Sequence, residues 1–231
     1  MFSYYGSKSK IVHLYPAPKH DLIIEPFAGS ARYALRYFDR DVILIDKYPV
    51  IVEVWKYLQS ASAKDILSLP KLSSGDDLRK YRLSRAEKNF LGFLVQRGVT
   101  RPGNKVSVWK DTNSSPTVAD DLKRISQQLF KIRHWEIRLG DYKDSPSAEA
   151  TWFIDPPYFK GGQYYSFSSQ KINFLELKEW VQTRRGQILV CENASADWME
   201  FQPLKRINGA RKMSDEVFWT NEKIAIQENL F

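Results

Sequence analysis

The chain has few of the residues that stabilise secreted proteins or hold metal ions. Among its 231 residues there is a single cysteine, Cys191, so no disulfide forms within the chain and a disulfide-dependent secreted fold is excluded. Its histidines, His13, His20 and His134, show no metal-ligand spacing, and no metal site is predicted. Cys191 lies in an apolar run typical of a buried strand, which favours a core residue over a nucleophile.

Long apolar runs are also missing. No run approaches the roughly 20 residues of a membrane-spanning helix, so we expect no membrane partner. The first ten residues, MFSYYGSKSK, are polar and contain no apolar signal region. We therefore expect a soluble, cytoplasmic protein.

Acidic residues are scarce in the middle of the chain. The net charge is +8, and residues 61–145 hold 17 Lys and Arg against 10 Asp and Glu, which is +7, whereas the remainder holds 18 against 17. A localised basic surface is typical of proteins that bind a polyanion. A solvated basic face without a partner is the alternative that charge alone leaves open.

Short apolar runs alternate with helical patterns, which predicts an α/β fold with a largely parallel sheet covered by helices. Strands are expected at 21–25, 41–46, 135–141, 150–155 and 186–193, with two more in 202–221; helices are expected at 29–38, with Ser30 near the helix start, 49–59 and 172–185. Residues 61–133 have mostly helical patterns around a loop at Pro102-Gly103. We predict one domain from 1–60 and 134–231, with 61–133 as an insertion.

The most specific stretch is Asp155-Pro156-Pro157-Tyr158, which directly follows the apolar run Ala150–Ile154. Proline cannot donate to a sheet ladder, so the strand ends there and the polar groups are held at the sheet edge, where open α/β sheets bind ligands. The Asp155 carboxylate and the Pro156 carbonyl can accept both hydrogens of an exocyclic amino group. Tyr158 can stack on a planar base.

A second motif, Glu25 to Ser30 (EPFAGS), follows the first strand and contains Gly29. Glycine allows a ligand to approach the backbone, and Asp46, at the end of the second strand, can accept hydrogen bonds from ribose hydroxyls. The repeated glycines of a dinucleotide fingerprint are missing. The pair Gly29 and Asp46 favours an adenosine-type ligand.

Together these motifs resemble those of the alpha group of N6-adenine DNA methyltransferases, which contains the Dam-like enzymes. The resemblance covers residues 4 to 221 in the order of that group. Its motifs are YYGSK with Tyr4, Gly6 and Lys8, then EPFAGS, LIDKYP with Asp46, FIDPPY with Asp155, LVCEN ending at Asn193, and RKMSDEVFWTN ending at Asn221.

The resemblance implies a Rossmann-like fold with a mostly parallel seven-stranded sheet, S-adenosylmethionine (SAM) as cofactor without a metal, and transfer of methyl to a flipped-out adenine in double-stranded DNA. The implied catalytic residues are Asp155, Pro156, Pro157 and Tyr158. The implied cofactor-binding residues are Tyr4, Gly6, Lys8, Glu25, Pro26, Phe27, Ala28, Gly29, Ser30, Asp46, Asp141, Tyr142 and Asp155.

The resemblance implies that the mainly helical insertion 61–133 is a target-recognition region that binds DNA, and further contacts are expected from the loop after Tyr158. Residues 97–110 resemble the β-hairpin that such enzymes place on DNA. The residues predicted to bind DNA are Lys8, Arg97, Arg101, Asn104, Lys105 and Tyr165, and Tyr164, Tyr165 and Phe167 are candidates to close over the base. Several phosphate contacts predict binding that weakens with salt.

Two positions depart from the family pattern: Ala31 replaces the second glycine of the SAM loop, and Ser7 stands where a second glycine is common. The alternatives are an N4-cytosine DNA methyltransferase, an inactive SAM- or DNA-binding relative, and an RNA or small-molecule methyltransferase. A monomer is expected, in a bacterial cell or as a viral protein in a bacterial host. The sequence leaves open whether a restriction endonuclease is its partner.

Overall fold

The computed structural model describes residues 1–107, 116–208 and 213–223. It is an α/β protein with one seven-stranded mixed sheet in the order β3-β2-β1-β4-β5-β7-β6. The strands are β1 Leu22–Glu25, β2 Asp41–Asp46, β3 Glu136–Leu139, β4 Glu149–Ile154, β5 Arg185–Asn193, β6 Gln202–Asn208 and β7 Met213–Thr220. The first five pair in parallel, whereas β7 is antiparallel to both β5 and β6. The predicted α/β class and mostly parallel sheet are confirmed.

Alternating apolar side chains along the central strands build a core on each face of the sheet. Ile23 of β1 and Phe153 of β4 belong to one core, and their neighbours Ile24 and Trp152 belong to the other. Because successive side chains of a strand point to opposite faces, an unbroken apolar run fills both cores. Helices therefore cover both faces.

The α-helices are α1 Arg32–Arg36, α2 Pro49–Ser60, α3 Ala63–Ser68, α4 Arg85–Val95, α5 Val118–Ser126 and α6 Phe174–Gln182. Short 3-10 helices include Lys8–Lys10, Val12–Leu14, Leu78–Lys80, Leu129–Ile132, Tyr142–Asp144, Gly162–Tyr164 and Ser169–Lys171. Helix α1 is shorter than the predicted 29–38, and Ala31, not Ser30, is its N-cap. The helix starts late because Gly29 and Ala31 both adopt positive φ.

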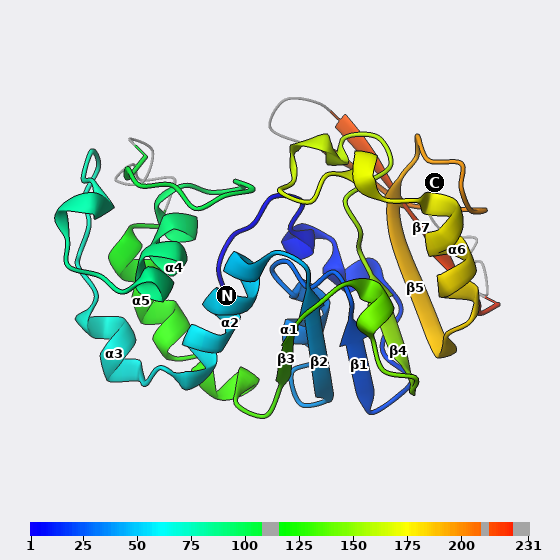
Figure 1. Cartoon of the computed structure of the whole chain (residues 1–231), viewed down its shortest axis with the longest axis horizontal. Helices are drawn as coiled ribbons and strands as arrows, with labels where there is room; N and C mark the ends of the chain where they lie inside the picture. The colour runs from blue at the N-terminus through cyan, green and yellow to red at the C-terminus, as the bar shows by residue number, and fades with distance from the viewer. Residues whose placement is uncertain (108–115, 209–212, 224–231) are drawn as a thin grey trace.

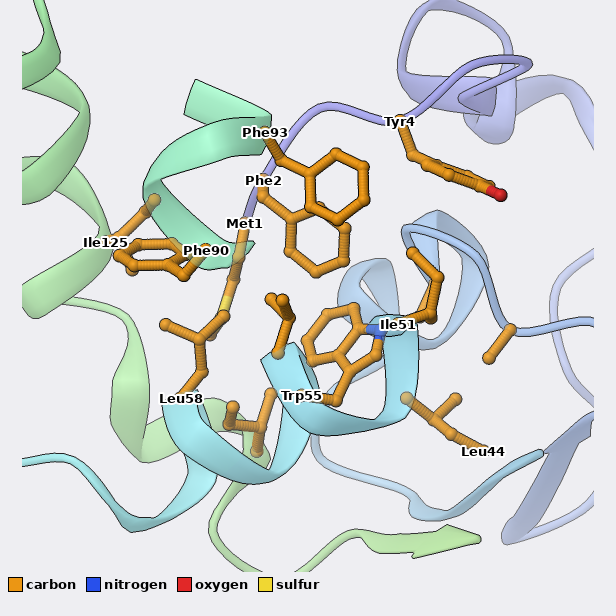
Figure 2. Packing of buried hydrophobic residues seen from close by; sticks show 14 of the residues in the cluster. Met1, Phe2, Tyr4, Leu44, Ile51, Trp55, Leu58, Phe90, Phe93 and Ile125 are labelled. Carbon is orange, nitrogen blue, oxygen red and sulfur yellow. The ribbon is translucent and has the colours of Figure 1, made fainter. Parts of the chain in front are cut away.

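Helices α3, α4 and α5 gather beyond the β3 edge of the sheet (Figure 1). They share a core with α2: Phe2 packs between Trp55 of α2 and Phe93 of α4, and Met1 lies beside Leu58 and Phe90 (Figure 2). The described part of segment 61–133 thus shares one core with α2, which itself packs on the sheet. The role of residues 61–133 as an inserted target-recognition region that binds DNA stays a prediction.

The hairpin predicted for residues 97–110 is wrong for its described part, 97–107. That part is an irregular loop whose one strand-like contact is an isolated antiparallel bridge between Lys105 and Asp77. The loop instead packs on α4: the Gly103 N–H donates to the Gly92 carbonyl at 3.1 Å, and the Ser107 N–H donates to the Val95 carbonyl at 3.1 Å. Residues 108–110 lie outside the described residues.

Across the described residues, none of the helices combines the length and the apolar character needed to cross a membrane.

Candidate ligand cleft at the strand ends

A cavity of about 350 Å³ opens at the carboxyl ends of β1, β2 and β4. Strand order reverses between β1 and β4, and such a switch point is where open α/β sheets bind ligands. Every residue predicted to bind cofactor lines this one cavity, although the chain separates them widely. They are Tyr4, Gly6, Lys8, Glu25, Pro26, Phe27, Ala28, Gly29, Ser30, Asp46, Asp141, Tyr142 and Asp155.

The turn after β1 is held by Asp46. One carboxylate oxygen of Asp46 accepts from the Gly29 N–H at 2.9 Å, and the other accepts from the Tyr48 N–H at 2.8 Å. The Trp55 indole donates to the Gly29 carbonyl at 2.9 Å, which fixes the turn from the other side. Burial raises the pKa of Asp46 to about 6, against the effect of these hydrogen bonds.

Glu25 is buried beneath the same turn. Its carboxylate accepts from the Ala34 N–H at 2.7 Å and so stabilises the start of α1. Burial raises the pKa of Glu25 to about 8. Ala31, between these groups, adopts a left-handed conformation with φ +44°.

Asp155, the first residue after β4, forms a close ion pair with Lys8. The ammonium group donates to both carboxylate oxygens, at 2.7 and 2.9 Å, and to the Gly6 carbonyl at 3.2 Å. Lys8 is 5% exposed, so its charge is directed at Asp155 and not at open solvent. Burial raises the pKa of Asp155, and the Lys8 charge opposes that rise.

Tyr158 lies behind this ion pair. The Lys8 ammonium is 4.6 Å from the centre of the Tyr158 ring, and the Tyr158 hydroxyl donates to Glu216 of β7 at 2.5 Å. Tyr158 and the buried Pro156 do not line the cavity, whereas Pro157 does. Glu216 is a residue that sequence reasoning missed, because only the antiparallel placement of β7 brings it here.

The far end of the cavity is lined by Phe27 and Tyr142, whose rings stack at 5.5 Å. Two ion pairs surround them: Lys47 with Asp141 at 2.7 Å, and Lys143 with Glu176 at 2.5 Å. The lining residues that the sequence did not predict for this site are Tyr5, Ser7, Ala31, Arg32, Lys47, Tyr48, Lys143, Phe153, Ser168, Lys171, Ile172, Asn173 and Glu176. The aromatic residues that follow Tyr158 predicted Tyr165 and Phe167 for this site, and both line the cavity.

The loop after Tyr158 crosses above the strand ends as the yellow-green segment of Figure 1, and its residues Tyr165, Phe167 and Lys171 line the cavity. Tyr165 contacts the rings of Tyr4 and Tyr5 at 5.8 and 5.3 Å, and its hydroxyl donates to the Tyr5 carbonyl at 3.1 Å. A side chain at Gly6, which has φ +72°, would collide with that hydroxyl. Glycine at position 6 therefore allows this close approach.

The predicted DNA contacts Arg97, Arg101, Asn104 and Lys105 do not line the cavity. They lie on the loop that packs on α4, and Arg97 approaches the buried Asp121 at 3.7 Å. This loop is tied to the N-terminal segment, because the Tyr5 N–H donates to the Val99 carbonyl at 3.2 Å. The N-terminal segment from Tyr5 to Lys8 thus connects the basic loop to the cavity.

No protein-family model matches this chain, and no curated protein is significantly similar to it. We therefore infer the chemistry of the cleft from its geometry. In the described part of the chain, no three His, Cys, Asp or Glu side chains are grouped to hold a metal ion.

Proposed function

We propose that this protein is a SAM-dependent DNA methyltransferase with a Rossmann-like fold that transfers a methyl group to the N6 amino group of adenine. The observation that carries the proposal is a single cavity in which the Gly29–Asp46 turn faces the Asp155 carboxylate. A methyl donor held by the turn and an amine held by Asp155 would lie next to each other, which is the main requirement for such a transfer.

The residues around the turn fit SAM. Each Asp46 oxygen accepts one backbone N–H and keeps a further lone pair for a ribose hydroxyl. Phe27 and Tyr142 offer an aromatic wall for a purine, and Glu25 provides a carboxyl group deeper in the cavity. When bound, SAM supplies an electrophilic methyl group.

Asp155 compensates for the weak nucleophilicity of the acceptor amine. The lone pair of an adenine amino group is delocalised into the ring, so the nitrogen is a weak nucleophile. The Asp155 carboxylate, which lines the cavity, accepts from this amino group, holds the nitrogen in place and stabilises the positive charge that develops on it. Lys8 favours the ionised form of Asp155 that this role needs.

The charge distribution supports DNA as the substrate. The excess of Lys and Arg lies in residues 61–145, and the loop 97–107 of that segment is hydrogen-bonded to the chain that leads into the cavity. A base inside a duplex cannot reach Asp155, so the target nucleotide has to rotate out of the helix.

The test is methyl transfer from labelled SAM to unmethylated DNA, with the modified nucleosides identified by mass spectrometry. We expect N6-methyladenine. N4-methylcytosine would keep the mechanism and change the base, and transfer to RNA alone would refute DNA as the substrate. No transfer to any nucleic acid would refute the proposed activity.

Two substitutions test the two proposed roles of the cavity separately: amine positioning by Asp155 and SAM binding by Asp46. Asp155→Ala should lower transfer by about 100- to 1000-fold, because it removes the charged acceptor, while SAM affinity stays within a few-fold of wild type. Asp46→Ala is the matched control and should weaken SAM binding instead. Equilibrium dialysis with labelled SAM checks both, and a Asp155→Ala variant with near-normal activity would contradict the assignment.

A further inference from the structure

The loop that follows Tyr158 combines aromatic and basic residues without any acid. From Pro156 to Leu175 the chain contains Lys160 and Lys171 but no Asp or Glu. Both lysines are exposed, and no ion pair of the described residues involves either of them. This composition is typical of surfaces that track a nucleic-acid backbone and stack on its bases.

The base of the loop is rigidly held. Glu192, at the end of β5, accepts from the Phe159 N–H at 2.8 Å, and the Asn193 amide donates to the Lys160 carbonyl at 2.6 Å. Gly162 packs so closely that an added Cβ would lie 2.7 Å from the Pro157 backbone and 2.8 Å from the Ser169 Cβ. Side chains on this loop are thus presented in a defined direction.

Two consecutive tyrosines at the tip of the loop have opposite environments. Tyr165 turns inward to Tyr4, Tyr5 and the cavity. Tyr164 is 65% exposed, lies outside the cavity lining and makes no ring contact within the described residues. A large aromatic ring exposed at the mouth of the cleft, between two lysines, has the chemistry of a base-stacking group and not of a core residue.

We infer that residues 159–171 form a second DNA-contacting surface, in which Tyr164 stacks in the space that the flipped-out nucleotide leaves in the duplex, and Lys160 and Lys171 bind the flanking phosphates. The inference rests on the proposed function. Rotating a base out breaks its stacking on both sides, and an inserted side chain replaces part of that contact. The loop is suited to this role because it starts at Tyr158, beside the pocket that receives the base.

Tyr164→Ala and Tyr164→Phe test the insertion, with Leu175→Ala on α6 as an exposed apolar control. We expect Tyr164→Ala to lower kcat/KM for duplex DNA at least 10-fold, to change kcat/KM for single-stranded DNA less than 2-fold, and to leave SAM affinity intact. Tyr164→Phe and Leu175→Ala should match wild type. Equal losses on duplex and single strands, or no loss on duplex, would overturn the role of Tyr164.

The double variant Lys160→Gln/Lys171→Gln tests the phosphate contacts by DNA affinity alone, so it does not need methyl transfer. The slope of log Kd against log salt should fall by about 2 relative to wild type, as expected for two lost phosphate contacts. An unchanged slope refutes these contacts even if the enzyme methylates DNA. A reduced slope in a protein that transfers no methyl group would support the surface and refute the proposed function.

Discussion

Ala31, in the turn between β1 and α1, is a residue at which the backbone is strained. Its φ of +44° lies in the left-handed region, which costs a residue with a Cβ about 1–2 kcal/mol. Ala31→Gly removes that strain but gives the unfolded chain more freedom, worth about 0.4–1 kcal/mol. We therefore expect a net stabilisation of about 0.5–1 kcal/mol in urea unfolding.

Ala34→Gly is the matched control for Ala31→Gly, because Ala34 lies in helix α1 and is buried like Ala31. Glycine in a helix costs about 1 kcal/mol relative to alanine, so this variant should unfold more easily. If both glycine variants lost stability to the same extent, backbone strain at Ala31 would not lower the free energy of unfolding of the wild type.

Lys8 controls the ionisation of Asp155 and hence the pH profile of the proposed reaction. Burial raises the pKa of Asp155, and the Lys8 ammonium at 2.7 Å opposes this. Lys8→Met removes the opposing charge, so the pKa of Asp155 should rise further and the acidic limb of the rate profile should move to higher pH. Single-turnover rates measured from pH 5 to pH 9 check this.

The control for Lys8→Met is Lys10→Met, which removes an exposed lysine from the same short helix. It should leave the half-maximal pH where it is. An acidic limb at the same pH in Lys8→Met and wild type would mean that Lys8 does not set the ionisation of the group that limits the rate.

At the scale of elements, helix α4 fixes the basic loop through a contact that only glycine allows. A Cβ at Gly92 would lie 2.5 Å from the Pro102 Cβ and 2.8 Å from the Gly103 carbonyl oxygen. Gly92→Ala should therefore destabilise the protein by about 1–3 kcal/mol, although alanine is the better helix former. Lys88→Ala, on the same helix, should change stability by less than about 0.5 kcal/mol, and equal denaturation midpoints would contradict the close packing.

The strands could be predicted from the sequence because their signal is local. β4 and β5 are apolar on both faces, and the proline pair after Ile154 marks where β4 ends. The antiparallel position of β7 between β5 and β6 has no local signal, so Glu216 could not be predicted beside Tyr158. The loop 97–107 was misread because its backbone pairs with α4 and Asp77 and not with itself.

The residues that line the cleft could likewise be predicted only in part. Groups that end a strand or follow it, such as Asp46 and Asp155, were predictable because strand ends meet at one edge of a parallel sheet. Lys143 and Glu176 were missed, because they come from separate segments and meet only once α6 has packed. Sequence reasoning thus located the cleft but not the ion pair between Lys143 and Glu176 in its wall.

At the scale of the whole molecule, carboxyl groups of the cleft and of the end of β5 are kept out of water, and this makes stability depend on pH. Burial raises the pKa of Asp46 to about 6, of Glu192 to about 7 and of Glu25 to about 8. Each group then holds a proton in the folded chain at pH values where the unfolded chain has released it. Unfolding releases that proton, so a higher pH favours unfolding.

We therefore expect the free energy of unfolding to fall between about pH 4.5 and pH 8, by up to about 1.4 kcal/mol per pH unit for each group. Urea midpoints at pH 5, 6, 7 and 8 measure this. Glu25→Gln keeps an acceptor for the Ala34 N–H and removes the ionisable proton, so its midpoint should fall less with pH, whereas Glu200→Gln, an exposed control, should follow wild type. If Glu25→Gln also followed wild type, ionisation of the Glu25 carboxyl group would not destabilise the folded protein. The cavity would then be open to water at that depth.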